Sequence, residues 1–409
     1  MDRTILHCDC NGFFASVECI LHPEYRDVPM AVCGNPENRH GIILAKNERA
    51  KKYGIQTAET IWQAKKKCPG LVLAPPHHEE YRRYSKRINA IYQRYTDLVE
   101  PFGIDESWLD VTESRTLFGG GKQIADELRE IIRREIGLTV SVGVSFNKIF
   151  AKLGSDYKKP DATTVISREN WKGIVFPLPV NSLLYVGRSV NETLAKLGIH
   201  TIGQLAACDP SILTAHLGKA GGMLHDYANG LENSPVKNIN DRREIKSVGN
   251  GMTFKRDLVG INDIRIGVTT LADSVAGRMR KYGVKCWAVQ VTIRNPSFKT
   301  ITRQKTLASP THLAKELAGS AMELIQSAWN LNAPIRMLTI TGSNLIPDDV
   351  PCEQLSLFQS GSTEREKQEQ LETALDAIRL KYGSGSVAFG GILNNDIGIE
   401  EHDYEEEKE

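Results

Sequence analysis

The chain has 409 residues, of which 41% are hydrophobic and 25% are charged, which is ordinary globular composition with room for about two to four domains. No run approaches the roughly 18 apolar residues of a membrane span, and no signal-like segment precedes the first strand, so we expect a cytoplasmic protein. The eight cysteines include no Cys-x-x-Cys pair, which favours reduced thiols over zinc or disulfide sites.

The net charge of +1 conceals two segments of opposite sign. Residues 396–409 hold eight acidic residues against one lysine, whereas residues 242–305 hold fourteen Lys or Arg against four Asp or Glu. A basic segment of this kind is typical of a module that faces phosphates. A solvated face of mixed charge is the alternative.

The first predicted strand ends at a carboxylate. The apolar run Ile5–Cys8 leads to Asp9, and Gly12 then opens a helix that starts with Phe13 and Phe14. A strand, a tight turn and a helix start indicate a site for phosphate and metal. Asp9 taken alone could equally be a helix cap.

Residues 21–77 predict a small inserted unit. Strands are expected over 29–34 and 41–45, with helices around 46–53 and 61–68. The pair Pro75-Pro76 ends the insert, and a helix over 81–95 follows it.

Two adjacent carboxylates, Asp105 and Glu106, lie in the apolar frame 102–110. Burying them costs desolvation energy that a bound cation offsets, although a solvated turn is the commoner explanation of such a pair. With Asp9 they could hold two Mg²⁺ ions about 3.5–4 Å apart, which activate a 3′-hydroxyl and neutralise a leaving pyrophosphate.

The remaining chain predicts a helical segment followed by a second α/β unit. Residues 183–205 indicate a helix-hairpin-helix whose glycine turn approaches a DNA phosphate, a plain helix pair being the alternative. Residues 235–245 form a polar tether. The expected later elements are helices over 264–282, 313–329 and 363–382 and strands over 286–293 and 300–306, with Trp287, Val289, Val291 and Ile293 on one packed face.

These motifs closely resemble the signatures of Y-family (translesion) DNA polymerases, of the bacterial type. The shared features are the strand ending in Asp9, the helix Phe13-Phe14-Ala15-Ser16-Val17-Glu18 and the hairpin Ile104–Asp110. Residues 141–145, 147–148, 151–156 and 158–160 continue the match, which is strongest over residues 1–165.

The resemblance implies an α/β multidomain protein shaped as a right-handed polymerase. Its parts would be an α/β palm (1–20 and 78–165), small fingers (21–77), a helix-hairpin-helix thumb (166–234), a linker (235–245), an α/β little finger (246–346) and a flexible C-terminal tail (347–409).

The resemblance also assigns roles to single residues. Asp9, Asp105 and Glu106 are the implied catalytic carboxylates, which bind two Mg²⁺ ions together with the Cys10 carbonyl. The implied nucleotide contacts are the amides of Gly12, Phe13 and Phe14 and the side chains of Lys51 and Lys159, with Phe14 as the steric gate against a 2′-hydroxyl.

The chain departs from the family pattern at two positions of the fingers. Glu48 stands where relatives have a Tyr, and Lys51 stands where they have an Arg. A carboxylate beside phosphates would repel them, so Lys46 or Arg49 is expected to compensate.

A short motif in the tail, Gln354-Leu355-Ser356-Leu357-Phe358, resembles the peptide that binds the bacterial sliding clamp through apolar pockets. The start of a packed tail helix is the alternative.

The implied protein is a monomeric, low-fidelity translesion DNA polymerase associated with the nucleoid. Its implied partners are primer-template DNA, deoxynucleoside triphosphates and the clamp, and no membrane association is expected. Two other functions remain open, a catalytically inactive clamp-tethered DNA-binding subunit and a palm-fold nucleotidyl cyclase.

Overall fold

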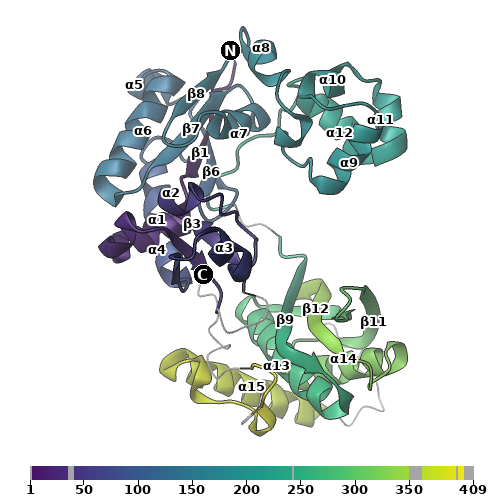
Figure 1. The fold of residues 1–409 in the computed structure, drawn as a ribbon. Helices are drawn as coiled ribbons and strands as arrows, with labels where there is room; N and C mark the ends of the chain where they lie inside the picture. Colours follow the sequence, from purple (N-terminus) through teal and green to yellow (C-terminus); the bar gives the residue numbers. More distant parts are fainter. Residues whose placement is uncertain (1, 36–40, 242–243, 350–361, 393–394, 400–409) are drawn as a thin grey trace. The chain divides into compact units, whose positions relative to one another are not determined.

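The computed structural model describes residues 2–35, 41–241, 244–349, 362–392 and 395–399 (Figure 1). These residues form two compact units, and the division falls between residues 241 and 244. Within the described ranges, no helix combines the length and the apolar character needed to cross a membrane.

A five-stranded sheet is the centre of the first unit. Its elements and their helices are β1 (Ile5–Cys10), α1 (Phe13–Leu21), α4 (His78–Tyr92), β5 (Val99–Pro101), β6 (Glu106–Asp110), α5 (Arg115–Phe118), α6 (Gly121–Ile136), β7 (Val140–Ser145), α7 (Lys148–Tyr157) and β8 (Thr163–Ile166). The strand order is β5-β6-β1-β7-β8. β1 pairs antiparallel with β6 and β7, and β7 pairs parallel with β8.

The central strand β1 buries all six of its residues, and its side chains alternate between the two faces of the sheet. Leu6, Cys8 and Cys10 belong to the core formed with α4 and α6. Ile5 packs on the other face with Ala151 of α7. Residues 7 and 9 therefore point toward α7.

Gly143 allows α7 to lie directly on the sheet. A Cβ atom at this position would be 1.9 Å from the Ala151 carbonyl oxygen and 2.4 Å from the Ser155 nitrogen. Gly143 is also the β7 partner of His7 in the strand register. This close approach brings the side chains of α7 over β1.

The insert between α1 and α4 has its own three-stranded sheet, in the order β3-β2-β4. Its elements are η1 (Pro23–Asp27), β2 (Met30–Cys33), β3 (Ile43–Lys46), α2 (Glu48–Lys51), α3 (Ile61–Lys67) and β4 (Val72–Ala74). Thr60 and Gln63 form a capping box that starts α3. The second strand begins at Ile43, later than predicted, because Ile42 makes only an isolated bridge to Thr60.

A cluster of short helices follows the sheet. They are α8 (Trp171–Val175), η2 (Val180–Ser182), α9 (Arg188–Lys196), α10 (Ile202–Ala207), α11 (Pro210–Leu217) and α12 (Lys219–Ala228). Gly198, with a φ of 74°, makes the turn between α9 and α10, as the glycine pattern predicts. After the helices, Val236 is buried beside Ile5, so the predicted linker 235–245 starts packed against the sheet.

The second unit is an antiparallel sheet covered by helices. It contains β9 (Ser247–Leu258), α13 (Gly260–Lys281), β10 (Val284–Arg294), β11 (Thr300–Thr311), α14 (Ala314–Ala328) and β12 (Ile335–Pro347), with the strand order β11-β10-β12-β9.

One detail of the predicted alternation in β10 is wrong. Val289, Val291 and Ile293 lie in the core, as predicted, but Trp287 lies outside it. The register with β11 shifts between Cys286 and Ala288, and Cys286 takes the buried position instead.

Much of the segment expected as a flexible tail is packed structure. α15 (Ser362–Tyr382), followed by η3 (Ser384–Ser386) and η4 (Gly390–Ile392), lies beside α13 (Figure 1). Arg280 of α13 pairs with Glu372 at 2.5 Å and with Asp376 at 2.6 Å, and the first pair is almost fully buried. Ile397 and Ile399 enter the core of the second unit. Removing one partner of such a buried pair is strongly destabilising, so α15 is an integral part of this unit.

Candidate active site

Asp9 and Glu106 meet at one end of β1 and β6, and the carboxylate of Asp105, the residue before Glu106, is close enough to interact with both charges. In the antiparallel register Asp9 lies opposite Glu106, and the Cys10 N–H donates to the Asp105 carbonyl oxygen at 3.0 Å. One ligand atom from each of Asp9, Glu106 and His7 lies within 4.8 Å of the others. The first unit thus brings together residues that the sequence separates by almost a hundred positions.

Two lysines lie against these carboxylates. Lys152 Nζ is 2.6 Å from Glu106 Oε2 and 3.3 Å from Asp9 Oδ2. Lys159 Nζ is 2.8 Å from Asp9 Oδ2 and 2.7 Å from Asp156 Oδ1. Burial alone would lower the pKa of each lysine, but the neighbouring carboxylates outweigh it and raise both pKa values.

Sequence reasoning proposed Lys159 but missed Lys152. The sequence did contain a pattern that could have identified Lys152, because this lysine lies in a helix among the buried residues Ile149, Ala151 and Leu153. A lysine within such a segment indicates a nearby buried acid.

His7 is a second residue that sequence reasoning missed. Its side chain is fully buried, and its Nδ1 is 2.8 Å from Ser155 Oγ. Nε2 is 3.4 Å from Glu106 Oε2, but without the alignment of a hydrogen bond. The available signal was a histidine two residues before Asp9 in an otherwise apolar strand, which places it on the same face.

The pKa values of the carboxylates differ because their neighbours differ. Burial, with the charges of Asp9 and Glu106, raises the pKa of Asp105 to about 6. Burial also acts to raise the pKa of Glu106, but His7 and Lys152 outweigh it and lower that pKa to about 2. Asp105 therefore carries an uncompensated charge near neutral pH, which is the condition that a cation relieves.

These residues fit a site for hard divalent cations. Mg²⁺ prefers oxygen ligands, and here the Asp9 and Glu106 carboxylates lie together while Asp105 interacts electrostatically with both. The excess negative charge at Asp105 gives such an ion a favourable electrostatic environment.

We predict that Asp105→Asn stabilises the metal-free protein. An aspartate whose folded pKa is raised from 3.8 to about 6 destabilises the fold above pH 6, and this penalty disappears as the pH falls toward 4. In EDTA at pH 8 the variant should gain about 1–2 kcal/mol in unfolding free energy, and less at pH 5.

Chemical denaturation at the two pH values checks this expectation. The exposed Asp97→Asn is the matched control, and its stability should remain at the wild-type value at both pH values. Equal or lower stability of Asp105→Asn at pH 8 would contradict the repulsion.

The start of α1 lies directly after Asp9 and Cys10. Gly12, with a φ of 53°, turns the chain into the helix, and the first backbone N–H groups of a helix have no partner within it. The amides of Gly12, Phe13 and Phe14 are thus placed next to the carboxylates, where an anion can be bound.

Phe14 is held by aromatic neighbours from α4. Its ring stacks on Tyr81 with centroids 4.1 Å apart, and His78 meets it edge-on at 5.8 Å. The Tyr81 hydroxyl in turn donates to the fully buried Glu18. The orientation of Phe14 is therefore set by its packing against α4.

Lys51 lies in the insert, on α2, and its described ion pair is with Glu48 at 3.5 Å. Arg49 instead pairs with Asp27 at 2.8 Å, and Lys46 donates to Thr57. Thus Lys51 itself offsets the unusual carboxylate of Glu48. Among the described contacts, Lys159 reaches Asp9, whereas the ion pair of Lys51 stays within α2.

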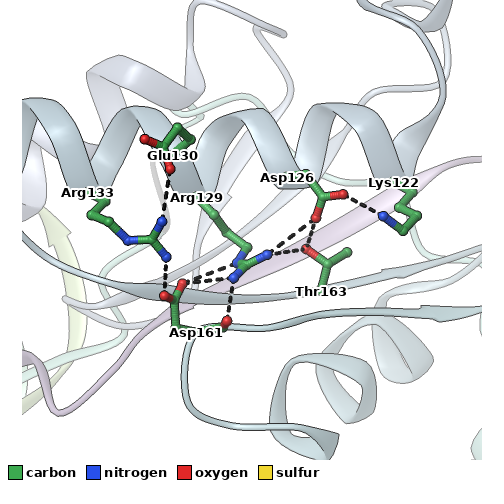
Figure 2. Close-up of polar contacts among 7 residues, drawn as sticks. All are labelled: Lys122, Asp126, Arg129, Glu130, Arg133, Asp161 and Thr163. Atoms are coloured by element: carbon green, nitrogen blue, oxygen red, sulfur yellow. Dashed lines mark hydrogen bonds and ion pairs between the residues drawn. The ribbon is translucent and has the colours of Figure 1, made fainter.

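The loop that carries Lys159 is anchored by an ionic network on α6 (Figure 2). Asp161, two residues after Lys159, pairs with Arg129 at 3.0 Å and also with Arg133. Next to it Thr163 donates to Asp126 at 2.6 Å. These contacts restrict the path of the chain after Lys159 and keep its amino group near Asp9.

The predicted clamp motif, Gln354–Phe358, lies outside the described residues. The described cysteines are all free thiols, as the sequence predicts; they are Cys8, Cys10, Cys19, Cys33, Cys68, Cys208 and Cys286.

Comparison with known proteins gives consistent results along the chain. The model of the impB/mucB/samB family matches residues 8–156, and the model of the impB/mucB/samB family C-terminal domain matches residues 245–357. DNA polymerase IV of Acetivibrio thermocellus is 48% identical over 399 residues, covering 98% of this chain and 99% of that protein. DNA polymerase IV 1 of Bacillus subtilis is 36% identical over 398 residues, covering 96% and 94%.

A solved structure gives the same fold. A Y-family DNA polymerase chimera superposes with a TM-score of 0.76 at 23% identity, covering 84% of this chain and 99% of that chain. The expected α/β multidomain polymerase fold is confirmed. The chain therefore belongs to the impB/mucB/samB family and is a translesion DNA polymerase of the Y family, of the DNA polymerase IV type.

Proposed function

We propose that the chain extends a DNA primer with two Mg²⁺ ions held by Asp9, Asp105, Glu106 and the Cys10 carbonyl. The observation that carries this proposal is the convergence of the carboxylates at the end of the β1–β6 pair, beside the start of α1. Bound Mg²⁺ supplies activation of the 3′-hydroxyl and neutralises charge at the phosphates. The protein would supply position, because Asp9 lies on the buried strand β1 and Glu106 starts the paired strand β6.

The incoming nucleotide would lie with its triphosphate at the start of α1. The amides of Gly12, Phe13 and Phe14 would donate to phosphate oxygens, and Lys159 would exchange its contacts with Asp9 and Asp156 for the triphosphate. Lys51 would approach from the insert as a further point charge. The ring of Phe14 would then lie against the sugar and act as the steric gate.

The domain roles follow the sheets and helices. We assign the palm to residues 1–20 and 78–165, the fingers to 21–77, the thumb to 166–234, the linker to 235–245, the little finger to 246–346 and the tail to 347–409. The central five-stranded sheet, the inserted sheet, the helices from α8 to α12 and the second unit support this division.

The single test of this proposal is primer extension by the full chain with deoxynucleotides, on undamaged and lesion-containing templates. Mg²⁺ should be required, and EDTA should stop the reaction. An inactive binding subunit would bind the duplex without extending the primer, and a cyclase would release cyclic nucleotide without any primer.

We further propose that the chain acts as a monomer in the bacterial cytoplasm near the nucleoid, where the sliding clamp tethers it to DNA through Gln354–Phe358. The bacterial origin of the relatives and the match of the motif support this partnership. A tether raises the effective concentration of the enzyme at the primer end without any new active-site contact.

Changing both Leu357 and Phe358 to Ala should remove the stimulation that a loaded bacterial clamp gives on a long primed template. We expect the stimulation to fall by at least about tenfold, because these side chains are the apolar anchors. Product lengths on a long template measure it, with a short clamp-free primer as the internal reference. Gln359→Ala, next to the motif, is the matched control, and full stimulation of the double variant would refute the tether.

A further inference from the structure

His7 occupies a position with direct access to the carboxylate cluster but has no assigned role. It lies two residues before Asp9 on β1, so both side chains point toward α7. Its ring is fully buried and packs edge-on against Trp108, with centroids 5.3 Å apart. A polar ring held in this way is costly unless both of its nitrogen atoms have partners.

Ser155 contacts the Nδ1 atom of His7, and its hydroxyl has two possible acceptors. Its Oγ is 2.8 Å from His7 Nδ1 and also 2.8 Å from the Lys152 carbonyl oxygen, and the hydroxyl has one proton to donate. If that proton goes to Lys152, His7 must carry its proton on Nδ1, and the lone pair of Nε2 then faces the Glu106 carboxylate at 3.4 Å.

That arrangement sets two buried acceptors against each other. If the hydroxyl donates to Nδ1 instead, the imidazole proton lies on Nε2 and points toward Glu106 Oε2. The Lys152 carbonyl keeps the backbone N–H of its own helix as a partner. The second arrangement turns a donor toward the Glu106 carboxylate in place of two facing acceptors, so electrostatics selects it, and a small shift of the carboxylate from its 3.4 Å separation would complete the hydrogen bond.

We propose that His7 is a positioning residue for Glu106: its Nε2–H, oriented by Ser155, donates to Oε2 and aims the other carboxylate oxygen at the cation site. This assignment rests on the proposed role of Glu106 as a metal ligand. Lys152 already donates to the same Oε2 atom at 2.6 Å, so a proton on His7 Nε2 would add a second donor to that oxygen. Such outer contacts orient ligating groups and raise metal affinity.

The position of His7 could also be explained by direct coordination through Nε2. This would require a lone pair on Nε2, and it would favour a softer cation over Mg²⁺, which prefers oxygen ligands. The two explanations differ in whether a ring nitrogen is bonded to the cation, so only direct coordination predicts ¹⁴N coupling to Mn²⁺ bound by the wild-type protein. Glutamine can donate its Nε2–H to Glu106, but its carbonyl oxygen is also able to bind a cation, so the substitution is read together with that coupling.

The test compares His7→Phe, which keeps a ring without a donor, with His7→Gln, which restores an N–H. Two quantities are measured on the full chain bound to primer-template DNA: Mn²⁺ binding without nucleotide, and the Mg²⁺ concentration that gives half-maximal single-turnover extension. We expect His7→Phe to weaken both about tenfold, since the loss of such a contact typically costs 10–100-fold, and His7→Gln to stay within about threefold of wild type. Ser155→Ala should give an intermediate loss.

Controls separate positioning from loss of packing. Cys8→Ala removes a buried side chain from the opposite face of β1 and should leave metal binding unchanged. Thermal unfolding and metal-free DNA binding are measured for each variant, and His7→Gln and Ser155→Ala keep the test valid if His7→Phe is unstable.

The proposal is overturned if His7→Phe binds Mn²⁺ as wild type does, or if folded His7→Gln is as weak as His7→Phe. The latter result would indicate that the shape of the ring matters and not a donated hydrogen bond, whereas ¹⁴N coupling to Mn²⁺ in the wild-type protein would indicate direct coordination. Glu106→Gln distinguishes failure of the underlying function: if it too binds Mn²⁺ normally, the metal site itself is wrongly placed. If Glu106→Gln weakens binding and His7→Phe does not, only the role of His7 is refuted.

Discussion

Replacing Asp9, Asp105 or Glu106 by Ala should reduce primer extension by about a thousandfold or more while leaving duplex binding nearly unchanged. Asp9 and Glu106 lie together and Asp105 interacts with both of their charges, so each substitution would remove charge and a proposed oxygen ligand where phosphoryl transfer needs cations. A loss of several kcal/mol in transition-state stabilisation corresponds to this factor. Duplex binding depends instead on basic surface, which these substitutions do not alter.

Single-turnover extension and fluorescence anisotropy of labelled primer-template measure the two properties separately. Glu113→Ala, an exposed carboxylate of the same unit, is the matched control and should extend primers as wild type does. Normal extension by Glu106→Ala would show that the active site has been assigned to the wrong residues.

Phe14→Ala should admit ribonucleotides, lowering the preference for deoxynucleotides by something on the order of a hundredfold. Phe14 is held by stacking on Tyr81, so its ring cannot easily turn aside from a 2′-hydroxyl. A gate of this kind works through an unfavourable contact, and truncation removes that contact without disturbing the metal ligands.

The measurement is the ratio of kcat/KM for matched deoxy- and ribonucleotides opposite the same template base. Phe14→Tyr retains the ring and should retain discrimination, which makes it the matched control. If Phe14→Ala discriminates as well as wild type, another side chain is the gate.

Local patterns predicted most of the secondary structure because burial alternates with a characteristic period in strands and helices. The apolar run before Asp9 became the fully buried β1, and the glycine at 198 became the turn between α9 and α10. The pattern failed at Trp287, where a shift of register changed which residue enters the core. Such a shift depends on the partner strand, which local periodicity does not describe.

The sequence of the tail predicted the helix 363–382 but not its place in the fold. Its acidic residues look solvated in isolation, since charged side chains are rarely buried unless they are paired. The pairing of Glu372 with Arg280, 92 positions away, decides that this helix packs on α13.

By itself, the sequence identified the family and with it the class of chemistry, and it predicted the candidate carboxylates. Carboxylates in apolar frames, at the end of a strand and in a hairpin, favour a cation site when they occur together with the other motifs of the family, and the spacing of Asp9 from Phe14 follows from local geometry alone. Only the tertiary structure decided which charges meet. The strand register sets Asp9 opposite Glu106, and Gly143 lets α7 approach closely enough for Ser155 to reach His7 across 148 positions. Contacts of this kind depend on how closely a helix packs against a sheet. The separation between the two elements leaves no periodic pattern in the sequence.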